Sequence, residues 1–316
     1  MTSHLPLVSI VIPVYNGVDY MREAIDSALS QTYPHIEVLV VNDGSTDSGA
    51  TAAVARSYGD KIRYFEKKNG GVSSALNYGI RNMQGSYFSW LSHDDVYEKT
   101  KVENQVKLLQ QYGSDSVIAY CSSDKINKHS QVYPNSFAQK PDRFFRHKDA
   151  LIYIIKNSAG GCSFLIPRGV FDKVGLFDES LRYCQDILMW WKIFMQPYDL
   201  VMSSDLGVHY RVHDRQVTQT MPQLYHTEAQ QIAQMMAPAF AACSDKKDYN
   251  FLYCYAKGEA VHGNKPSVSL CMEEAGKHGL FSFGQKMKLR LLCCYGSFRP
   301  FIRKMYYKLF RRVKTA

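Results

Sequence analysis

Residues 8–17 read VSIVIPVYNG, a mostly β-branched run that ends in a proline, a tyrosine and a turn. Val8–Ile12 predicts a buried strand, and Tyr20–Gln31 follows it with helical periodicity. A second apolar run, IEVLVV at Ile36–Val41, predicts the next strand. Short apolar runs separated by helices are typical of a mainly parallel sheet covered on both faces, so the fold class is α/β and Rossmann-like.

The same alternation continues along the first half of the chain. Further helices are expected at Asp47–Tyr58, Val72–Met83 and Val102–Tyr112, and further strands at Ile62–Phe65, Tyr87–Leu91 and Val117–Cys121. Residues 135–215 mix both patterns, and from about residue 222 only helices are readable. We expect a catalytic domain at residues 1–220 and a helical appendage at residues 221–316.

The charge of the chain is unevenly distributed. Of 316 residues, 46% are hydrophobic and 21% charged, which is typical of a folded globular protein. Residues 275–316 contain eleven Lys or Arg and no Asp or Glu, so removing them from the net charge of +9 leaves −2 for residues 1–274. A uniformly basic surface for nucleic acid is therefore not expected.

Cysteine spacing and the N-terminus bear on the compartment. The start, MTSHLPL, has no basic segment followed by a long apolar run, so no secretory signal is expected. No uncharged apolar stretch approaches the roughly 20 residues that span a bilayer, so no membrane span is expected either. The eight cysteines form no CxxC pair, which argues against zinc and favours the reducing cytoplasm. They are Cys121, Cys162, Cys184, Cys243, Cys254, Cys271, Cys293 and Cys294.

Polar residues follow the predicted strands at the edge where open α/β sheets bind ligands. After the second strand comes NDGSTD, residues 42–47. Asp43 could accept hydrogen bonds from a ribose or a base, whereas Asp47 fits a helix N-cap equally well. After Tyr87–Leu91 come Asp94 and Asp95, two adjacent carboxylates that repel each other unless a cation or donors compensate. Mg²⁺ or Mn²⁺ would do so, and a solvated helix cap is the alternative.

Four motifs in order give the chain a family resemblance. VSIVIPVYNG, VLVVNDGSTD, KNGGVSSALNYGI and WLSHDD together resemble the signature of the family 2 glycosyltransferases with the GT-A fold, over about residues 7–218. The resemblance implies a nucleoside-diphosphate sugar as the donor, with UDP as the expected nucleotide, and a metal ion. Many members have an aspartate where this chain has Ser92. This difference from the family pattern bears on how tightly the chain would bind the metal.

The resemblance also implies roles for individual residues. Nucleotide-sugar contacts fall on Pro13, Tyr15, Asp43, Lys68, Asn69, Gly70, Gly71 and Asp94, and the metal falls on Asp95. Gly161, in a Gly160–Gly161 pair, lies near donor and acceptor; an ordinary turn is the alternative. In HYRVH, Arg211 contacts phosphate or pairs with a carboxylate, and His213 is a metal ligand or a structural histidine.

A general base is expected before an aromatic helix. In YCQDILMWW, Asp186 stands where the family has its catalytic aspartate, and Gln185 replaces a common glutamate. Such a base removes the proton of the acceptor hydroxyl in an inverting transfer. The alternative is that Asp186 only caps the helix that carries Trp190 and Trp191, and both roles are compatible.

The C-terminal sequence predicts a membrane contact. Residues 298–313, FRPFIRKMYYKLFRRV, place apolar and basic side chains on different helical faces, as in helices that lie on anionic membranes. The alternative is a helix packed on the domain. We therefore expect a peripheral protein at the inner face of the cell membrane.

These observations favour an inverting hexosyl- or N-acetylhexosaminyltransferase that moves one sugar to a lipid-linked, polysaccharide or oligosaccharide acceptor, as in lipopolysaccharide or capsule biosynthesis. The QxxRW motif and membrane helices of processive synthases are absent from the sequence. A dehydrogenase is disfavoured because no GxGxxG follows Ile12. A nucleotidylyltransferase and a non-catalytic sugar-nucleotide-binding protein are the alternatives.

Overall fold

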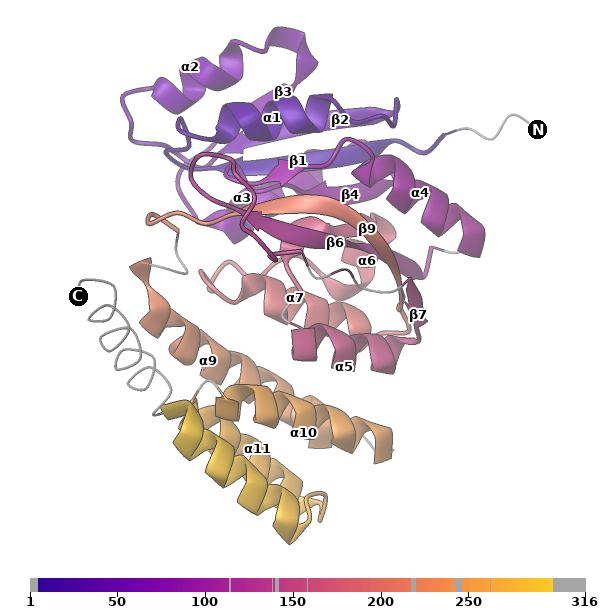
Figure 1. Ribbon diagram of the computed structural model, residues 1–316, viewed down its shortest axis with the longest axis vertical. Coiled ribbons are helices and arrows are strands. Elements are labelled where there is room, and N and C mark those ends of the chain that lie inside the picture. Colours follow the sequence, from indigo (N-terminus) through magenta and orange to yellow (C-terminus); the bar gives the residue numbers. More distant parts are fainter. Residues whose placement is uncertain are drawn as a thin grey trace. The chain divides into compact units, whose positions relative to one another are not determined.

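A computed structural model describes residues 5–113, 115–137, 139, 142–157, 159–216, 220–241, 246–261 and 263–297 (Figure 1). The chain divides into two compact units. Unit 1 comprises residues 1–150 and 159–220, and unit 2 comprises residues 151–158 and 221–316. Residues 151–158, which the sequence analysis assigns to the first domain, thus group with the C-terminal helices.

Unit 1 is built on a nine-stranded mixed sheet with the order β3-β2-β1-β4-β8-β6-β9-β5, in which β7 also pairs with β9. Neighbours run parallel from β3 to β4 and between β6 and β9, whereas β8, β5 and β7 pair antiparallel. The strands are β1 (Val8–Val14), β2 (Ile36–Asn42), β3 (Arg63–Glu66), β4 (Tyr87–Trp90), β5 (Val96–Tyr97), β6 (Val117–Ile126), β7 (Arg143–Phe145), β8 (Phe164–Pro167) and β9 (Asp199–Arg211).

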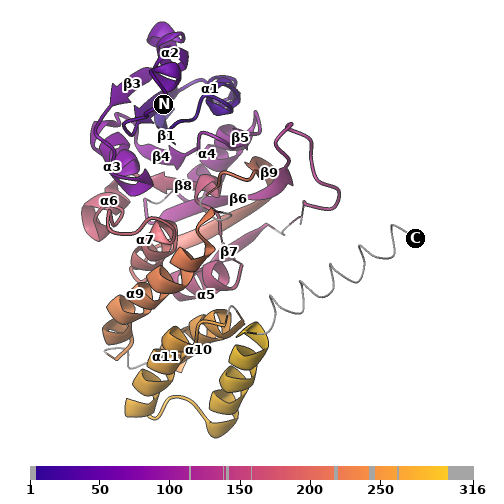
Figure 2. The same cartoon turned by 90° about the vertical axis from the view of Figure 1, so that its left-hand side faces the viewer.

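Helices cover both faces of this sheet. Figure 2 shows α3 on one side and α1 and α4 on the other. All seven residues of β1 are buried, as the sequence pattern predicts for a strand between two helical layers. The helices are α1 (Met21–Leu29), α2 (Ala50–Arg56), α3 (Val72–Asn82), α4 (Lys101–Tyr112), α5 (His147–Asn157), α6 (Gly169–Val174) and α7 (Gln185–Phe194), with 3-10 turns η1 (Gly59–Lys61) and η2 (Gly161–Ser163).

A glycine lets α3 approach the sheet closely. A Cβ atom on Gly79 would lie 2.3 Å from Cγ1 of Val11 on β1, so only glycine fits there. The close packing fixes the axis of α3 against β1. It thereby directs the N-terminus of α3 toward the carboxyl end of the neighbouring strand β2, where the functional residues begin.

The second half of the sheet was only partly predictable. The predicted strand at Val117–Cys121 extends to Ile126 as β6, because its later polar side chains are buried with polar partners. Ser122 Oγ donates to the carbonyl oxygen of Ser203 (3.2 Å), and Asp124 pairs with His209 across to β9. Such polar strand positions break the apolar pattern from which strands are recognised.

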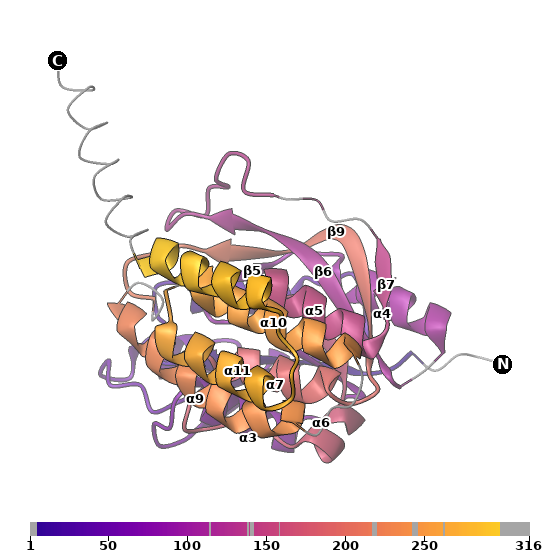
Figure 3. The same ribbon diagram turned by 90° about the horizontal axis from the view of Figure 1, so that it is seen from below.

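The described part of unit 2 is helical, in agreement with the pattern after residue 222. It contains α9 (Pro222–Ala241), α10 (Lys246–Val261), α11 (Lys265–Lys277) and a further helix at residues 283–297. Figure 3 shows α9, α10 and α11 packed side by side. Within the described ranges no helix has the length and apolar character of a membrane span. The amphipathic segment predicted at residues 298–313 lies outside them.

Candidate functional site

Asp43 organises the loop that precedes α3. It follows β2 and is buried, and its carboxylate accepts hydrogen bonds from the backbone N–H groups of Gly70 (3.0 Å) and Gly71 (2.7 Å). Lys67 Nζ lies 2.7 Å from the same carboxylate. Gly71 has φ +87°, a conformation that favours glycine, and this turn aims both N–H groups at Asp43. The KKNGG loop is therefore held at the end of β2.

The neighbours of Asp43 refine the sequence prediction. Asn69 Nδ2 donates to the backbone carbonyl of Asp43 (2.9 Å), whereas Lys68, the lysine named from the resemblance, has an exposed side chain. Lys67 is the cation at Asp43, and the sequence analysis missed it. The only signal was its place two residues after the predicted strand at residues 62–65.

Replacing Lys67 tests this arrangement. Lys67→Met leaves a buried carboxylate without its cation, which we expect to cost about 1–3 kcal/mol of unfolding free energy. Lys68→Met is the matched control for stability, and an equal loss in both variants would contradict the role of Lys67.

The first strand and the NDGSTD turn are cross-linked at their ends. Asn16 Oδ1 accepts the N–H of Thr46 (2.8 Å), and the hydroxyl of Tyr15 lies 3.4 Å from Thr46 Oγ1. Pro13 is buried within β1, whereas Tyr15 is 43% exposed. Asp47 accepts the N–H of Thr51 in the first turn of α2 (2.9 Å), although Gly49, two residues later, occupies the N-cap position itself. Tyr15 is thus the accessible aromatic side chain at this edge.

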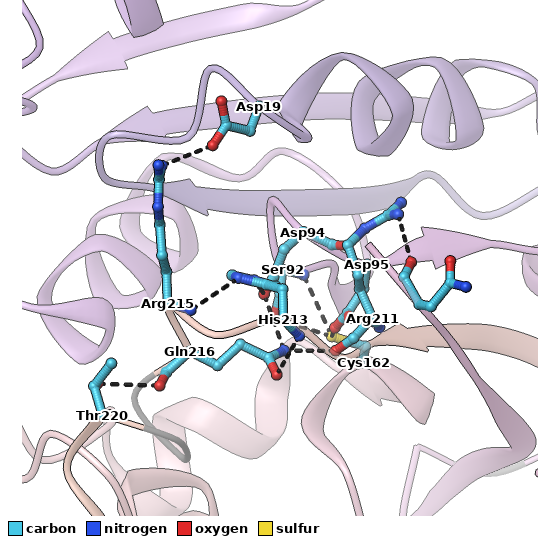
Figure 4. Close-up of polar contacts among 11 residues, drawn as sticks. Asp19, Ser92, Asp94, Asp95, Cys162, Arg211, His213, Arg215, Gln216 and Thr220 are labelled. Carbon is cyan, nitrogen blue, oxygen red and sulfur yellow. Dashed lines mark hydrogen bonds and ion pairs between the residues drawn. The ribbon is translucent and has the colours of Figure 1, made fainter. Parts of the chain in front are cut away.

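Asp94 and Asp95 are adjacent, but they have different surroundings (Figure 4). Asp95 is buried, and its carboxylate accepts the backbone N–H of Arg211 (2.9 Å) and the thiol of Cys162 (3.4 Å). Burial, and then the charge of Asp94, raise the pKa of Asp95 well above its ordinary value. Asp95 therefore ties the turn after β4 to β9 and to η2.

Asp94 instead faces a histidine. Its Oδ2 lies 3.0 Å from Nε2 of His213 and 3.2 Å from Nε2 of Gln216. Burial alone would raise the pKa of Asp94, but the hydrogen bonds from His213 and Gln216 and the nearby His93 lower it to about 2. Because Nδ1 of His213 accepts the N–H of Arg215 (3.3 Å), Nε2 carries the proton shared with Asp94.

His213 contacts Asp94 and not Asp95. The resemblance assigns the metal to Asp95 and His213, but the structure brings His213 to Asp94. The 3.0 Å separation of Asp94 Oδ2 and His213 Nε2 is that of a hydrogen bond, and a cation would have to replace the proton between the two atoms. No group of three or more His, Cys, Asp or Glu side chains able to hold a metal occurs in the described part of the chain.

Ser92, which stands where many relatives have aspartate, contacts a thiol. Its backbone N–H donates to Sγ of Cys162 (3.3 Å), and its hydroxyl lies 3.4 Å from the same sulfur. Burial raises the pKa of Cys162 well above its ordinary value, so this thiol stays protonated and donates to Asp95. Cys162 is therefore an uncharged neighbour of Asp95, and Ser92 contacts Cys162.

The side chain of Arg211 is buried and links several segments of the chain, so it is not exposed to a phosphate. Its Nε donates to the carbonyl of Asp94 (2.7 Å), its Nη2 pairs with Glu23 on α1 (2.6 Å), and its guanidinium lies over the ring of Tyr20. Nη1 reaches the loop after β6 at Ser130 Oγ (2.9 Å). With its side chain fully buried and its donors engaged, Arg211 fixes the backbone of Asp94.

Arg211→Lys is expected to lower the unfolding free energy by about 2–4 kcal/mol, because an ammonium cannot replace the guanidinium fork and leaves buried acceptors unpaired. Urea unfolding measures the loss. Arg215→Lys is the control, since Arg215 pairs with Asp19 at the surface (2.8 Å) and should change stability by less than about 0.5 kcal/mol. Equal effects in the two variants would contradict the role of Arg211.

Gly160 and Gly161 are explained by packing. A Cβ atom on Gly161 would lie 2.3 Å from the ring of Trp90, and one on Gly160 would lie 2.2 Å from the hydroxyl of Tyr210. Trp90 ends β4, two residues before Ser92. The glycine pair therefore lets η2 close against the strand that presents Asp94 and Asp95, and a contact of Gly161 with a donor stays a prediction.

Asp186 lies in the first turn of α7. It is partly buried, and desolvation raises its pKa to about 6 although it accepts the N–H of Ile187 (2.8 Å). The preceding segment is fixed to α3, since Ser73 Oγ donates to the carbonyl of Leu181 (3.4 Å). Gln185 is buried, and its Oε1 finds no hydrogen-bond partner among the described residues. A carboxylate with such a pKa suits a general base near neutral pH.

Aromatic side chains connect α7, which begins with Gln185 and Asp186, to the end of β4. Trp190 contacts Phe177, with ring centroids 6.3 Å apart, and Phe177 contacts Trp90 at 6.0 Å.

A cavity of about 410 Å³ lies elsewhere, over α4, β7 and β9, and none of the predicted site residues lines it.

Comparisons with known proteins agree with these observations. A glycosyltransferase of Rickettsia typhi is 48% identical over 231 residues, which are 72% of this chain and 71% of that protein. One of Rickettsia bellii is 51% identical over 197 residues, 61% of this chain but 28% of that longer protein. The structure of S. aureus TarS 1–349 with UDP superimposes with a TM-score of 0.67 at 16% identity, covering 92% of this chain and 87% of that one.

The likeness to TarS confirms the predicted fold class. The family model described as glycosyl transferase family 2 matches residues 9–175, more than half of the sequence. The chain belongs to glycosyl transferase family 2, and it is a glycosyltransferase.

Proposed function

We propose that this chain transfers one sugar from a nucleoside-diphosphate sugar to an acceptor hydroxyl, with inversion at the anomeric carbon. The observation that carries the proposal is the pair formed by Asp94 and His213, together with a carboxylate, Asp186, whose pKa suits a base. UDP is the nucleotide we favour, because S. aureus TarS, which shares the fold, has been crystallised with UDP and with UDP-GlcNAc.

Asp94 and His213 would hold Mg²⁺ or Mn²⁺. When bound, such a cation neutralises the charge that develops on the departing diphosphate. Divalent cations in nucleotide sites commonly use one or two protein ligands plus phosphate, so a two-residue set suffices. Binding through Nε2 would require the neutral His213 ring to carry its proton on Nδ1, which would end the hydrogen bond that Nδ1 accepts from the N–H of Arg215. Arg211, through the carbonyl of Asp94, keeps this carboxylate in place.

On the acceptor side, Asp186 would take the proton of the attacking hydroxyl. A positioned base contributes about 10²–10⁴ in rate. Asp43 and the loop that it anchors would bind the nucleoside, together with Tyr15. We propose a lipid-linked or glycan acceptor, which would bring the enzyme to the inner face of the cell membrane.

The test is a panel of nucleoside-diphosphate sugars assayed by nucleotide release, with Mn²⁺, with Mg²⁺ and with a chelator. We expect release from a UDP-sugar that the chelator abolishes. Donor binding without turnover for any donor and acceptor would favour the non-catalytic alternative. Ser92 and Gln185 suggest this alternative, because they replace acidic residues that are common in the family. Release of pyrophosphate from a nucleoside triphosphate and a sugar phosphate would favour the nucleotidylyltransferase.

A further inference from the structure

The helix at residues 283–297 of unit 2 has two apolar faces. One is buried in the unit and contains Leu289 and Cys293. The other is exposed and contains Phe283, Met287, Leu291 and Tyr295, which are 80%, 38%, 66% and 56% exposed. Four large apolar side chains in regular succession on a solvent-facing surface are unusual for a helix packed on one side only.

The spacing places these four side chains, here called the 283–295 ridge, in one stripe. Steps of four residues drift by about 40° around a helix, so the ridge occupies a sector of about 120°. Leu289 lies two residues from both Met287 and Leu291, about 160–200° from each. The ridge therefore faces directly away from the buried side and runs for about 18 Å along the axis.

Basic residues flank the ridge. Lys288 and Arg290 are exposed on its two sides, and Lys286 is partly exposed. Glu274 is the last acidic residue of the sequence, and residues 298–316 add seven more Lys or Arg. A second copy of this helix would bring like charges together along the contact, which opposes self-association. An apolar stripe between cationic flanks instead complements an anionic surface with an apolar interior.

We propose that the 283–295 ridge docks unit 2 into the interface of an anionic lipid bilayer. The helix lies along the membrane plane, the ridge enters the boundary between headgroups and acyl chains, and Lys288 and Arg290 reach out to lipid phosphates. The proposal goes beyond the transfer reaction, since it concerns a described surface of unit 2, and its test requires no turnover.

Flotation of the full chain with vesicles measures the docking. Vesicles of phosphatidylcholine with about one third phosphatidylglycerol should bind the protein, and pure phosphatidylcholine vesicles should bind much less. Leu291→Glu should lower the bound fraction on anionic vesicles about tenfold. Ser269→Glu adds the same charge at an exposed position of α11 and should leave the fraction unchanged. Because both positions are exposed, neither change is expected to unfold the unit.

A fluorescent probe separates insertion from mere charge attraction. The native tryptophans Trp90, Trp190 and Trp191 are buried, so a Leu291→Trp variant adds one exposed indole. We expect its emission to shift to the blue on anionic vesicles and to be quenched by brominated acyl chains. Flotation unchanged by Leu291→Glu would assign binding to residues 298–316 alone and overturn the proposal. A lipid-free dimer that Leu291→Glu dissociates, without lipid binding, would also overturn it.

Discussion

Asp186→Asn is expected to lower the turnover number by about 10²–10⁴ while leaving the affinity for the nucleotide within about twofold. The amide keeps the shape of the carboxylate and can accept the N–H of Ile187 (2.8 Å in the native chain), but it cannot take a proton from an acceptor. Nucleotide release under saturating donor measures the rate, and calorimetry with UDP measures the affinity.

The same variant should be more stable than the native chain. The pKa of Asp186 is raised to about 6, so ionisation of this side chain opposes folding at neutral pH, and asparagine removes that cost. Asp172→Asn, at an exposed position on α6, is the control for loss of one negative charge. If Asp186→Asn lost stability and kept its turnover, Asp186 would be a helix cap and not the base.

Activity should depend on pH through the same carboxylate. The base form of Asp186 is lost as the pH falls through about 6, so turnover should fall about tenfold per unit below that value. The pKa of Asp94, lowered to about 2, keeps this ligand ionised throughout the range. Initial rates between pH 4.5 and 8 test the expectation. A profile with no inflection near pH 6 would assign the proton transfer to another group.

Asp94→Asn should have the second large effect. Loss of this carboxylate removes the proposed cation ligand, and a few kcal/mol of leaving-group stabilisation corresponds to about 10²-fold or more in rate. The concentration of Mn²⁺ for half-maximal activity should rise at least about tenfold. Both quantities follow from nucleotide release measured over a range of Mn²⁺.

Asp95→Asn is the matched variant, one residue away and equal in size. Its Oδ1 can still accept the N–H of Arg211, and the amide removes a buried charge whose ionisation is already disfavoured by burial and by Asp94. We expect unchanged Mn²⁺ dependence and no loss of stability. The reverse pattern, with Asp95→Asn losing Mn²⁺ and Asp94→Asn keeping it, would return the cation to the residue named from the resemblance.

The strand ends were predictable because apolar runs and polar turns are local signals. VSIVIPV and IEVLVVN form parallel neighbours in register, and Asp43 and Asp94 follow β2 and β4, the two strands that flank β1. β5 and β7 were not separately predicted, because they are two and three residues long, too short for a pattern. The buried polar positions of β6 hid its second half.

Side-chain partners at the site were not predictable, because they depend on which distant segments meet. Nothing in the sequence distinguishes Asp94 from Asp95; the difference arises where the end of β9 supplies a backbone N–H to one and His213 to the other. Arg211 similarly pairs with Glu23, which lies 188 positions away in sequence. Lys67, Cys162 and Gln216 were missed for the same reason.

The stereochemistry of the first product tests the central claim most directly. With a reactive α-linked nucleotide sugar and water as a slow acceptor, proton NMR can identify the sugar anomer before it equilibrates. Attack by a hydroxyl activated by Asp186, opposite the departing diphosphate, predicts that the β-sugar forms first and that Asp186→Asn abolishes it. An α-sugar formed first would contradict a base-assisted single displacement at this site.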